Sequence, residues 1–192
     1  MDDATLAAYL QELGAQCDFA RTALEIFNQS GQQSAHGGVL FAAQAAVTAT
    51  GQVAALLWPA RARARRRGEA LREVLGLPEK HPFNDRRFSE LLDHSDDQVD
   101  RWLSQHRTGR AVFDVVTPVD QIAIPGLTEA DLYRVVDPKT GVFYYRGVGY
   151  NLDALAKTLG DVRRRVSQAA ADLERRSPRH MGDGAGPGAA SG

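Results

Sequence analysis

The amino-acid sequence predicts a mostly α-helical fold, a bundle of four or five helices with a small antiparallel β-hairpin inserted before the last helix. Apolar residues recur at helical spacing over the first thirty residues and again from residue 152 to residue 173. Between about residues 111 and 147, segments rich in β-branched and aromatic residues replace that pattern. A chain of 192 residues with no break in composition before its tail fits one domain, which we place at residues 1–176.

The first two helices are predicted from two apolar stripes. The stripe of the first helix alternates spacings of four and three, at Leu6, Leu10, Leu13, Cys17, Ala20, Leu24 and Phe27. The polar run "GQQSAHGG" interrupts it, and a second helix then fits residues 39–58. Its stripe consists mainly of small side chains, at Val39, Ala43, Ala46, Val47, Thr50, Ala54 and Leu57. Small side chains allow close contact, so we expect the two helices to pack antiparallel along these stripes.

The second helix also has the length and neighbours of a membrane span. The segment "GGVLFAAQAAVTATGQVAALLW" carries no charge over 22 residues and is followed at once by "RARARRR". However, it is mostly alanine, it includes Gln44, Gln52, Thr48 and Thr50, and it has few of the leucines and isoleucines that drive insertion. We therefore expect a helix buried inside the bundle and no membrane partner.

Pro59 ends this helix, and an arginine-rich helix, "RARARRRGEALREVLGL", follows. One interpretation is a surface for nucleic-acid phosphates, with Arg61, Arg65, Arg66 and Arg72 as the RNA-binding candidates. The other is a solvated helix face, which the lack of interleaved aromatic residues favours. The formal net charge of the whole chain is -1, so any nucleic-acid surface must be a local patch.

The stretch "RRFSELLDHSDDQVDRW", residues 86–102, holds the candidate chemistry, on a helix that Asn84 or Asp85 can cap. Arg87 and His94 are seven residues apart, two helical turns, so their side chains are expected on one line of the helix. A guanidinium can bind a phosphate and an imidazole can move a proton, which suits metal-free RNA cleavage. Similar spacings occur at Arg101 with His106 and at Arg175 with His180, and an exposed structural histidine is the alternative for His94.

From residue 111 the segments "AVFDVV", "QIAIP", "LYRVVD" and "VFYYRG" read as strands, and "DPKTG" is a hairpin turn between the last two. Asn151 can cap the final helix. The apolar stripe of that helix is Leu152, Leu155, Leu159, Val162, Val166 and Leu173. The Gly/Ala/Pro-rich tail, residues 177–192, cannot bury enough surface to order itself and is expected to be disordered.

The run from "LLWPARARARRRGEALREVLGL" to "RRFSELLDHSDDQVDRW" resembles the HEPN superfamily, helical domains that include many metal-free ribonucleases. It is similar to a bacterial group in which an uncharged helix ends in Leu-Trp-Pro, an arginine-rich helix follows, and a motif helix carries Arg-Asn, two variable residues, an acid and His. The resemblance covers about residues 35–105. It implies that His94 is the family histidine, Asp93 the acid before it and Trp102 the aromatic residue after it.

The chain departs from the family motif at one point. Ser89 and Glu90 stand where the group has Arg-Asn, so the usual arginine is missing. The resemblance then leaves Arg87 as the substitute, with Arg86 as support, and Glu90 places a negative charge beside any phosphate. The resemblance also implies a homodimer in which the two motif helices face each other across a shared cleft.

Two functions are expected from the sequence. The first is a metal-independent endoribonuclease of a toxin–antitoxin or phage-defence type, with a cognate antitoxin as a further partner. The second is a non-catalytic HEPN-like module that binds a partner protein, a nucleotide or RNA. No metal or other cofactor is expected, and the lone Cys17 excludes an internal disulfide. The acidic N-terminus "MDDATLAAYLQELG" does not read as a secretory signal, so we expect a cytoplasmic location.

Overall fold

The computed structural model describes residues 1–92, 95–106 and 110–176. Its helices are α1 (Asp3–Gln32), α2 (His36–Leu57), α3 (Arg65–Leu75), α4 (Arg86–Leu92), α5 (Ser95–Gln105) and α6 (Leu152–Arg176). Its strands are β1 (Val115–Val116), β2 (Arg134–Asp137), β3 (Val142–Tyr145) and β4 (Val148–Asn151). The prediction of a mostly helical fold with a small β element before the last helix is confirmed. The prediction for the tail, residues 177–192, lies outside the described residues.

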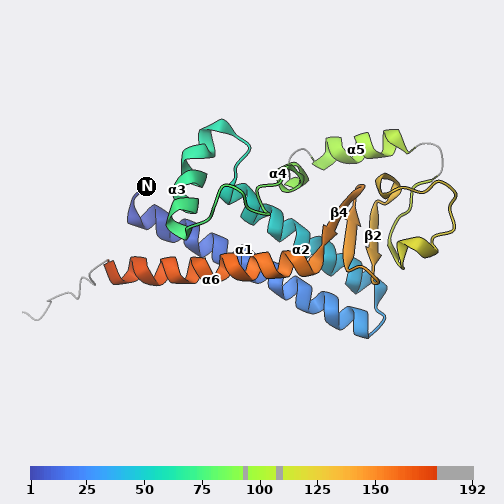
Figure 1. Cartoon of the computed structure of the whole chain (residues 1–192), viewed down its shortest axis with the longest axis horizontal. Coiled ribbons are helices and arrows are strands. Elements are labelled where there is room, and N and C mark those ends of the chain that lie inside the picture. Colours follow the sequence, from blue (N-terminus) through green and yellow to red (C-terminus); the bar gives the residue numbers. More distant parts are fainter. Residues whose placement is uncertain (93–94, 107–109, 177–192) are drawn as a thin grey trace, which may run out of the picture.

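The long helices α1, α2 and α6 form the body of the molecule, and α1 and α2 make an antiparallel hairpin (Figure 1). Every residue of the predicted α2 stripe is buried, and so is the α1 stripe from Leu6 to Ala20, while Leu24 and Phe27 are only partly buried. Helix α6 lies along α1 and begins where predicted, because the Asn151 side chain accepts a hydrogen bond from the Ala154 backbone N–H at 2.8 Å.

Of the described residues, α2 is the one helix long and apolar enough to cross a membrane. However, 61% of its most apolar window is buried inside the protein. It contacts α1 on one side and α3, α4 and the sheet on others. The prediction that α2 is a core helix of the bundle agrees with this packing.

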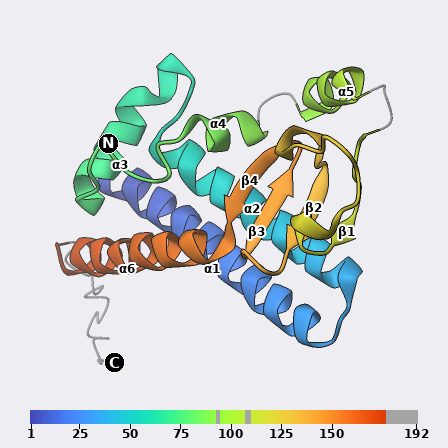
Figure 2. The same ribbon diagram turned by 45° about the vertical axis from the view of Figure 1, so that its right-hand side comes forward.

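The β element is larger than the predicted hairpin. Four strands form a sheet in the order β1, β2, β3, β4, in which β1 is parallel to β2 and the other pairs are antiparallel (Figure 2). The paired row Val136, Phe143 and Tyr150 faces the main helical core. On the opposite face, Val135 and Tyr144 belong to a second, smaller core.

The segment "QIAIP" is not a strand, so that prediction was wrong. Residues 119–121 form a 3₁₀ turn, and Ile122 and Ile124 pack against the second core from the loop. Pro118 precedes the segment, and Pro125 is its last residue. Proline has no N–H to donate to a ladder, so this apolar run covers the sheet rather than joining it.

Two tight turns shape the sheet. The predicted turn "DPKTG" is confirmed, because the buried Asp137 accepts from the Lys139 N–H at 2.8 Å and Gly141 closes the turn with a φ of 66°. The turn between β3 and β4 has only two residues, Arg146 and Gly147, with φ angles of 50° and 79°. Positive φ at both positions matches the twist of paired strands, and the turn directs Arg146 toward the helices.

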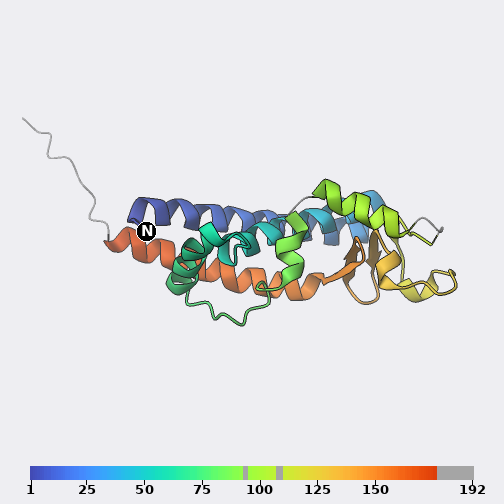
Figure 3. The ribbon, with the colours of Figure 1, turned by 90° about the horizontal axis from the view of Figure 1, so that it is seen from above.

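The stretch 86–102 forms two helices instead of the single predicted one. Helix α4 ends at Leu92, α5 begins at Ser95, and the two point in different directions (Figures 1 and 3). The five residues after Leu92, "DHSDD", offer no apolar face, and serine and aspartate favour caps and turns over helix interiors. Helix α4 therefore includes Arg87 but not His94, and the expectation that both side chains lie on one line of a single helix is not met by α4.

Candidate functional site

A cavity of about 380 Å³ lies between α4, α5 and the β3–β4 hairpin, and we call it the arginine cavity. Arg87 of α4, Arg101 of α5 and Arg146 of the hairpin turn line it. Three aromatic side chains line it as well, Trp102, Tyr145 and Tyr150. Asp97 is the acidic residue of this lining. Cations beside aromatic surfaces suit a ligand that combines phosphates with planar bases.

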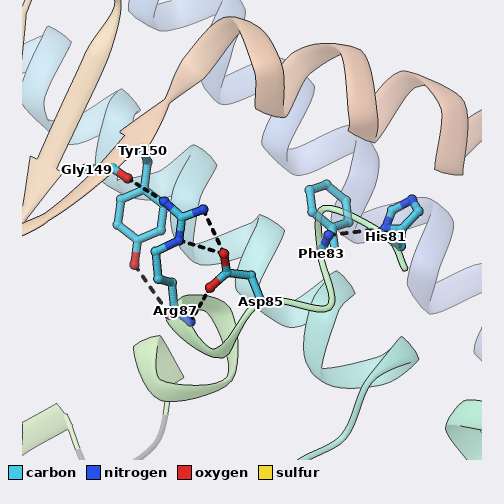
Figure 4. A network of polar contacts seen from close by, with 6 residues as sticks. All are labelled: His81, Phe83, Asp85, Arg87, Gly149 and Tyr150. Atoms are coloured by element: carbon cyan, nitrogen blue, oxygen red, sulfur yellow. Dashed lines mark hydrogen bonds and ion pairs between the residues drawn. The ribbon is translucent and has the colours of Figure 1, made fainter. Parts of the chain in front are cut away.

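Arg87 is anchored at this cavity by three partners (Figure 4). Its Nε and Nη2 donate to Asp85 Oδ2 at 3.0 and 2.8 Å, and its Nη1 donates to the Gly149 carbonyl at 3.0 Å. The Tyr150 hydroxyl donates to the Arg87 carbonyl at 3.4 Å. Arg87 thus ties α4 to β4, and Asp85 offsets part of its charge.

The charge state of Asp85 reflects the same contacts. Partial burial pushes the pKa of its carboxyl upward, but hydrogen bonds from the Arg87 side chain and backbone outweigh burial and hold the pKa below its ordinary value. Tyr150 is nearly fully buried, and burial raises the pKa of its phenol to about 12. Tyr150 therefore stays neutral and acts here as a hydrogen-bond donor.

The other two arginines, Arg146 and Arg101, differ in the contacts that they make within the protein. Arg146 Nη2 donates to the Leu91 carbonyl at 3.2 Å, and the guanidinium lies 4.5 Å from the centre of the Tyr145 ring. Arg101 is exposed, and no ion pair joins it to another residue of the part of the chain that the structure describes. Arg101 is therefore the cation best placed to accept a phosphate without breaking an internal contact.

The rival pair Arg101 and His106 does not act together in this structure. The His106 ring stacks on Trp102 at 4.0 Å, its Nδ1–H donates to the Trp102 carbonyl at 2.6 Å, and its Nε2 lies 3.4 Å from Asp131 Oδ1. Only 9% of the His106 side chain is exposed. His106 is a packed structural histidine, whereas Arg101 projects into the cavity.

The predictions for His94 and Asp93 lie outside the described residues. In the sequence His94 stands three residues from Leu91 and three from Asp97, and both of these line the arginine cavity. Glu90 belongs to α4, and its side chain also lies outside what the structure describes. The structure thus brings the neighbours of His94 on both sides to the cavity that contains Arg87.

A second cavity, of about 600 Å³, is lined by Arg86 but not by Arg87. We call it the α3 cavity, because it lies beside α3 and includes Arg65 and Arg72 together with Arg86. Three acids, Glu69, Glu79 and Asp85, also line it, so its formal charges balance. Arg86 was predicted to support Arg87, but Arg86 lines the α3 cavity and Arg87 lines the arginine cavity.

The arginines of the predicted RNA-binding surface divide into two groups. Arg61, Arg65 and Arg66 are exposed. Arg72 has only 13% of its side chain exposed, and its Nη1 donates to the Leu57 carbonyl at 2.5 Å. Its guanidinium also lies over the Trp58 ring and pairs with Glu79 at 3.1 Å. Arg72 therefore caps the end of α2, and the prediction that it contacts RNA is not supported by its geometry.

Three residues of the arginine cavity were not predicted from the sequence, namely Tyr145, Arg146 and Tyr150. Arg146 reaches the carbonyl of Leu91, 55 residues earlier in the chain. The "YYRG" run was predicted as the end of a strand. An arginine that precedes a glycine in a two-residue hairpin turn, however, lies at the end of the hairpin, where its side chain can contact a neighbouring element. That local signal could have marked Arg146 as a residue available for a site.

Comparison with protein-family models, with curated proteins and with solved structures finds no match to this chain. Across residues 1–92, 95–106 and 110–176, no group of three or more His, Cys, Asp or Glu side chains is placed to hold a metal ion.

Proposed function

We propose that the protein binds RNA at the arginine cavity and acts as a HEPN-like, metal-independent endoribonuclease. The convergence of Arg87, Arg101 and Arg146 on one cavity lined by aromatic rings supports this proposal most directly. Guanidinium groups bind phosphates in planar, bidentate geometry, and aromatic rings stack on bases. In the sequence His94 lies between Leu91 and Asp97, which both line the cavity, and it completes the proposed site.

In the proposed reaction the ribose 2′-hydroxyl attacks the neighbouring phosphorus, and the bond from phosphorus to the 5′-oxygen breaks. One proton leaves the 2′-hydroxyl and one is gained by the 5′-oxygen, and His94 transfers a proton in this exchange. The arginines stabilise the negative charge that grows on the phosphate oxygens. The products are a 2′,3′-cyclic phosphate and a 5′-hydroxyl, so water and redox cofactors are not consumed.

The second candidate is a module that binds RNA or another phosphate-bearing partner without cutting it. The contacts of Arg87 favour this candidate, because its guanidinium is already held by Asp85 and Gly149. An arginine fixed in this way serves the fold and has less freedom to follow a phosphate through a reaction. Arg101 and the exposed arginines Arg61, Arg65 and Arg66 would then supply the binding charge.

The cellular role that we propose for the ribonuclease is in toxin–antitoxin or phage-defence systems, in the cytoplasm and as a homodimer. A ribonuclease of this kind must be restrained in growing cells, so an antitoxin is its expected partner. Expression of this protein in cells tests the role, because a toxic ribonuclease should stop growth. Co-expression of the gene for its antitoxin should then restore growth.

The test of catalysis uses purified protein and end-labelled single-stranded RNA, with and without EDTA. Wild type should cut the RNA equally in both conditions, and His94→Ala should lower the rate by about 10²–10⁴-fold. His36→Ala is the matched control, because His36 is an exposed histidine at the start of α2, far along the chain from the cavity. RNA binding by the wild type without cleavage would decide for the second candidate.

A further inference from the structure

A row of aromatic side chains leads away from the arginine cavity. Tyr145 lines the cavity, the centre of the Tyr133 ring lies 5.9 Å from that of Tyr145, and the centre of the Phe113 ring lies 5.0 Å from that of Tyr133. Tyr145 and Tyr133 are half-buried, whereas Phe113 at the far end of the row is 44% exposed. We call these three side chains the aromatic row.

Contacts with neighbouring residues hold the rings of the row in place. The nearly buried Trp102 ring meets the Phe113 and Tyr133 rings at steep angles, with ring centres 5.3 and 4.8 Å away. The Trp102 indole N–H donates to the Ala130 carbonyl at 3.0 Å, and the Tyr133 backbone N–H donates to the Val112 carbonyl at 2.9 Å. The row is therefore preorganised, and a ligand that binds it has few side chains to immobilise.

Each of the two tyrosines has an arginine beside its ring. The Arg146 guanidinium lies 4.5 Å from the centre of the Tyr145 ring, and the Arg134 guanidinium lies 5.8 Å from the centre of the Tyr133 ring. Aromatic rings interleaved with cations suit a strand of bases joined by phosphates, because bases stack on the rings and guanidinium groups bind the phosphates.

The far end of the row also has a cation. Asp114, the residue after Phe113, pairs with Arg134 at 2.6 Å, so these two charges offset each other within the protein. Arg110, three residues before Phe113, is exposed and donates to the Gly126 carbonyl at 3.4 Å, which is a long hydrogen bond. Arg110 is therefore the cation that a phosphate beside Phe113 would meet.

We infer that the aromatic row is a second RNA subsite, on which unpaired bases stack outside the arginine cavity. The inference rests on the proposal that the arginine cavity binds RNA, whether or not the RNA is cut. Because Tyr145 belongs to both, a strand held in the cavity continues onto the row without leaving the protein. Bases in a duplex have no free face for such stacking, so the RNA that uses the row is single-stranded.

The test measures binding of 2′-O-methyl RNA by fluorescence anisotropy, because a blocked 2′-hydroxyl cannot attack and binding is then separated from cleavage. Phe113→Leu keeps an apolar side chain against Trp102 but removes the aromatic face. It should lower the affinity for a single strand by at least about fivefold, and Phe113→Trp should restore it. A duplex of the same sequence should bind wild type and Phe113→Leu equally.

Two further variants complete the test. Phe41→Leu is the matched control, because Phe41 is a 69% exposed phenylalanine of α2 that does not line the arginine cavity, and it should bind RNA like wild type. Arg101→Gln removes a cation from the arginine cavity and should weaken binding by the same factor with and without Phe113→Leu, since the effects of separate contacts add as free energies.

The outcomes separate this inference from the proposed function. Equal single-strand affinities of Phe113→Leu and Phe41→Leu would overturn the inference alone. A loss with Phe113→Leu that is as large for the duplex as for the single strand would also overturn it, because Phe113 would then act through the shape of the protein and not by stacking. If Arg101→Gln binds like wild type while Phe113→Leu does not, the row binds RNA and the proposed function of the arginine cavity is wrong. If wild type binds no RNA, both are wrong.

Discussion

The Asp85 carboxylate holds the Arg87 guanidinium through Nε at 3.0 Å and Nη2 at 2.8 Å, and its other oxygen accepts the Arg87 backbone N–H at 2.9 Å. One acid therefore positions the proposed phosphate-binding arginine and also caps the first turn of α4. An incoming phosphate must compete with this carboxylate for the guanidinium. Both side chains are partly exposed, so the ion pair itself adds little to stability, about 0–1 kcal/mol.

Asp85→Asn separates these two roles of Asp85. The amide oxygen can still accept the Arg87 N–H, but the negative charge beside the cavity is gone. We expect tighter RNA binding. The fall of the RNA affinity with salt concentration should also be steeper, by about the amount that one phosphate contact contributes. Fluorescence anisotropy with labelled RNA at several salt concentrations measures both. Asp100→Asn, an exposed acid of α5 outside the cavity lining, controls for net charge. Equal affinities for the two variants would show that Arg87 does not contact the phosphate.

The second prediction separates a structural arginine from a surface arginine. Arg72→Ala removes the hydrogen bond from a nearly buried cation to the Leu57 carbonyl at the end of α2, together with the ion pair to Glu79, and should lower the free energy of unfolding by about 1.5–3 kcal/mol. Arg66→Ala changes an exposed residue and should leave stability within about 0.5 kcal/mol. Urea unfolding measures both values. If Arg72→Ala were as stable as Arg66→Ala, the capping role assigned to Arg72 would be wrong.

Local patterns in the sequence predicted the parts of the fold that local physics decides. The α1 and α2 stripes follow from helical periodicity, because each helix must bury one face. Asn151 and the "DPKTG" turn follow from side chains that bond their own backbone. The division of residues 86–102 between α4 and α5 was not predicted, although the gap in apolar spacing between Leu92 and Val99 was visible in the sequence.

Tertiary contacts decided the features that the sequence did not reveal. The arginine-rich run placed Arg72 among the RNA-binding candidates, but the approach of α3 to the end of α2 turns Arg72 inward. Gly68 permits this approach, because a Cβ there would lie 2.5 Å from Pro59 Cδ. Arg146 joined the site for a similar reason, since its turn folds back onto a helix end 55 residues earlier. Residue spacing along the chain carries no information about either contact.

The third prediction is that His106→Ala lowers the stability of the protein without lowering its rate of RNA cleavage. The substitution removes the stacking on Trp102 and leaves the buried Trp102 carbonyl without its imidazole donor. We expect the free energy of unfolding to fall by about 1–3 kcal/mol. RNA cleavage per folded molecule should be unchanged at a temperature well below the unfolding midpoint, because His106 does not line the arginine cavity. A catalytic loss as large as that of His94→Ala would reassign the proton-transfer role to His106.

The last prediction concerns acid stability and the contact between α1 and α6. Arg163 Nε of α6 donates to Asp18 Oδ1 of α1 at 3.0 Å, and this hydrogen bond holds the pKa of the Asp18 carboxyl below its ordinary value of 3.8. The folded state therefore binds the Asp18 proton less tightly than the unfolded chain does. Its contribution to stability is present above the ordinary value and is lost as the pH falls through the lower folded value.

Asp18→Asn removes this contribution and should be less stable than wild type at neutral pH. The difference in free energy of unfolding should shrink as the pH falls below 3.8 and vanish once Asp18 is protonated in both states. Urea unfolding at a series of pH values between neutrality and about pH 2 measures the two curves. Glu73→Gln, at an exposed acid of α3 without an ion pair among the described residues, should run parallel to wild type. A difference between Asp18→Asn and wild type that stayed constant with pH would mean that the contact stabilises the helices through packing and not through the charge of Asp18.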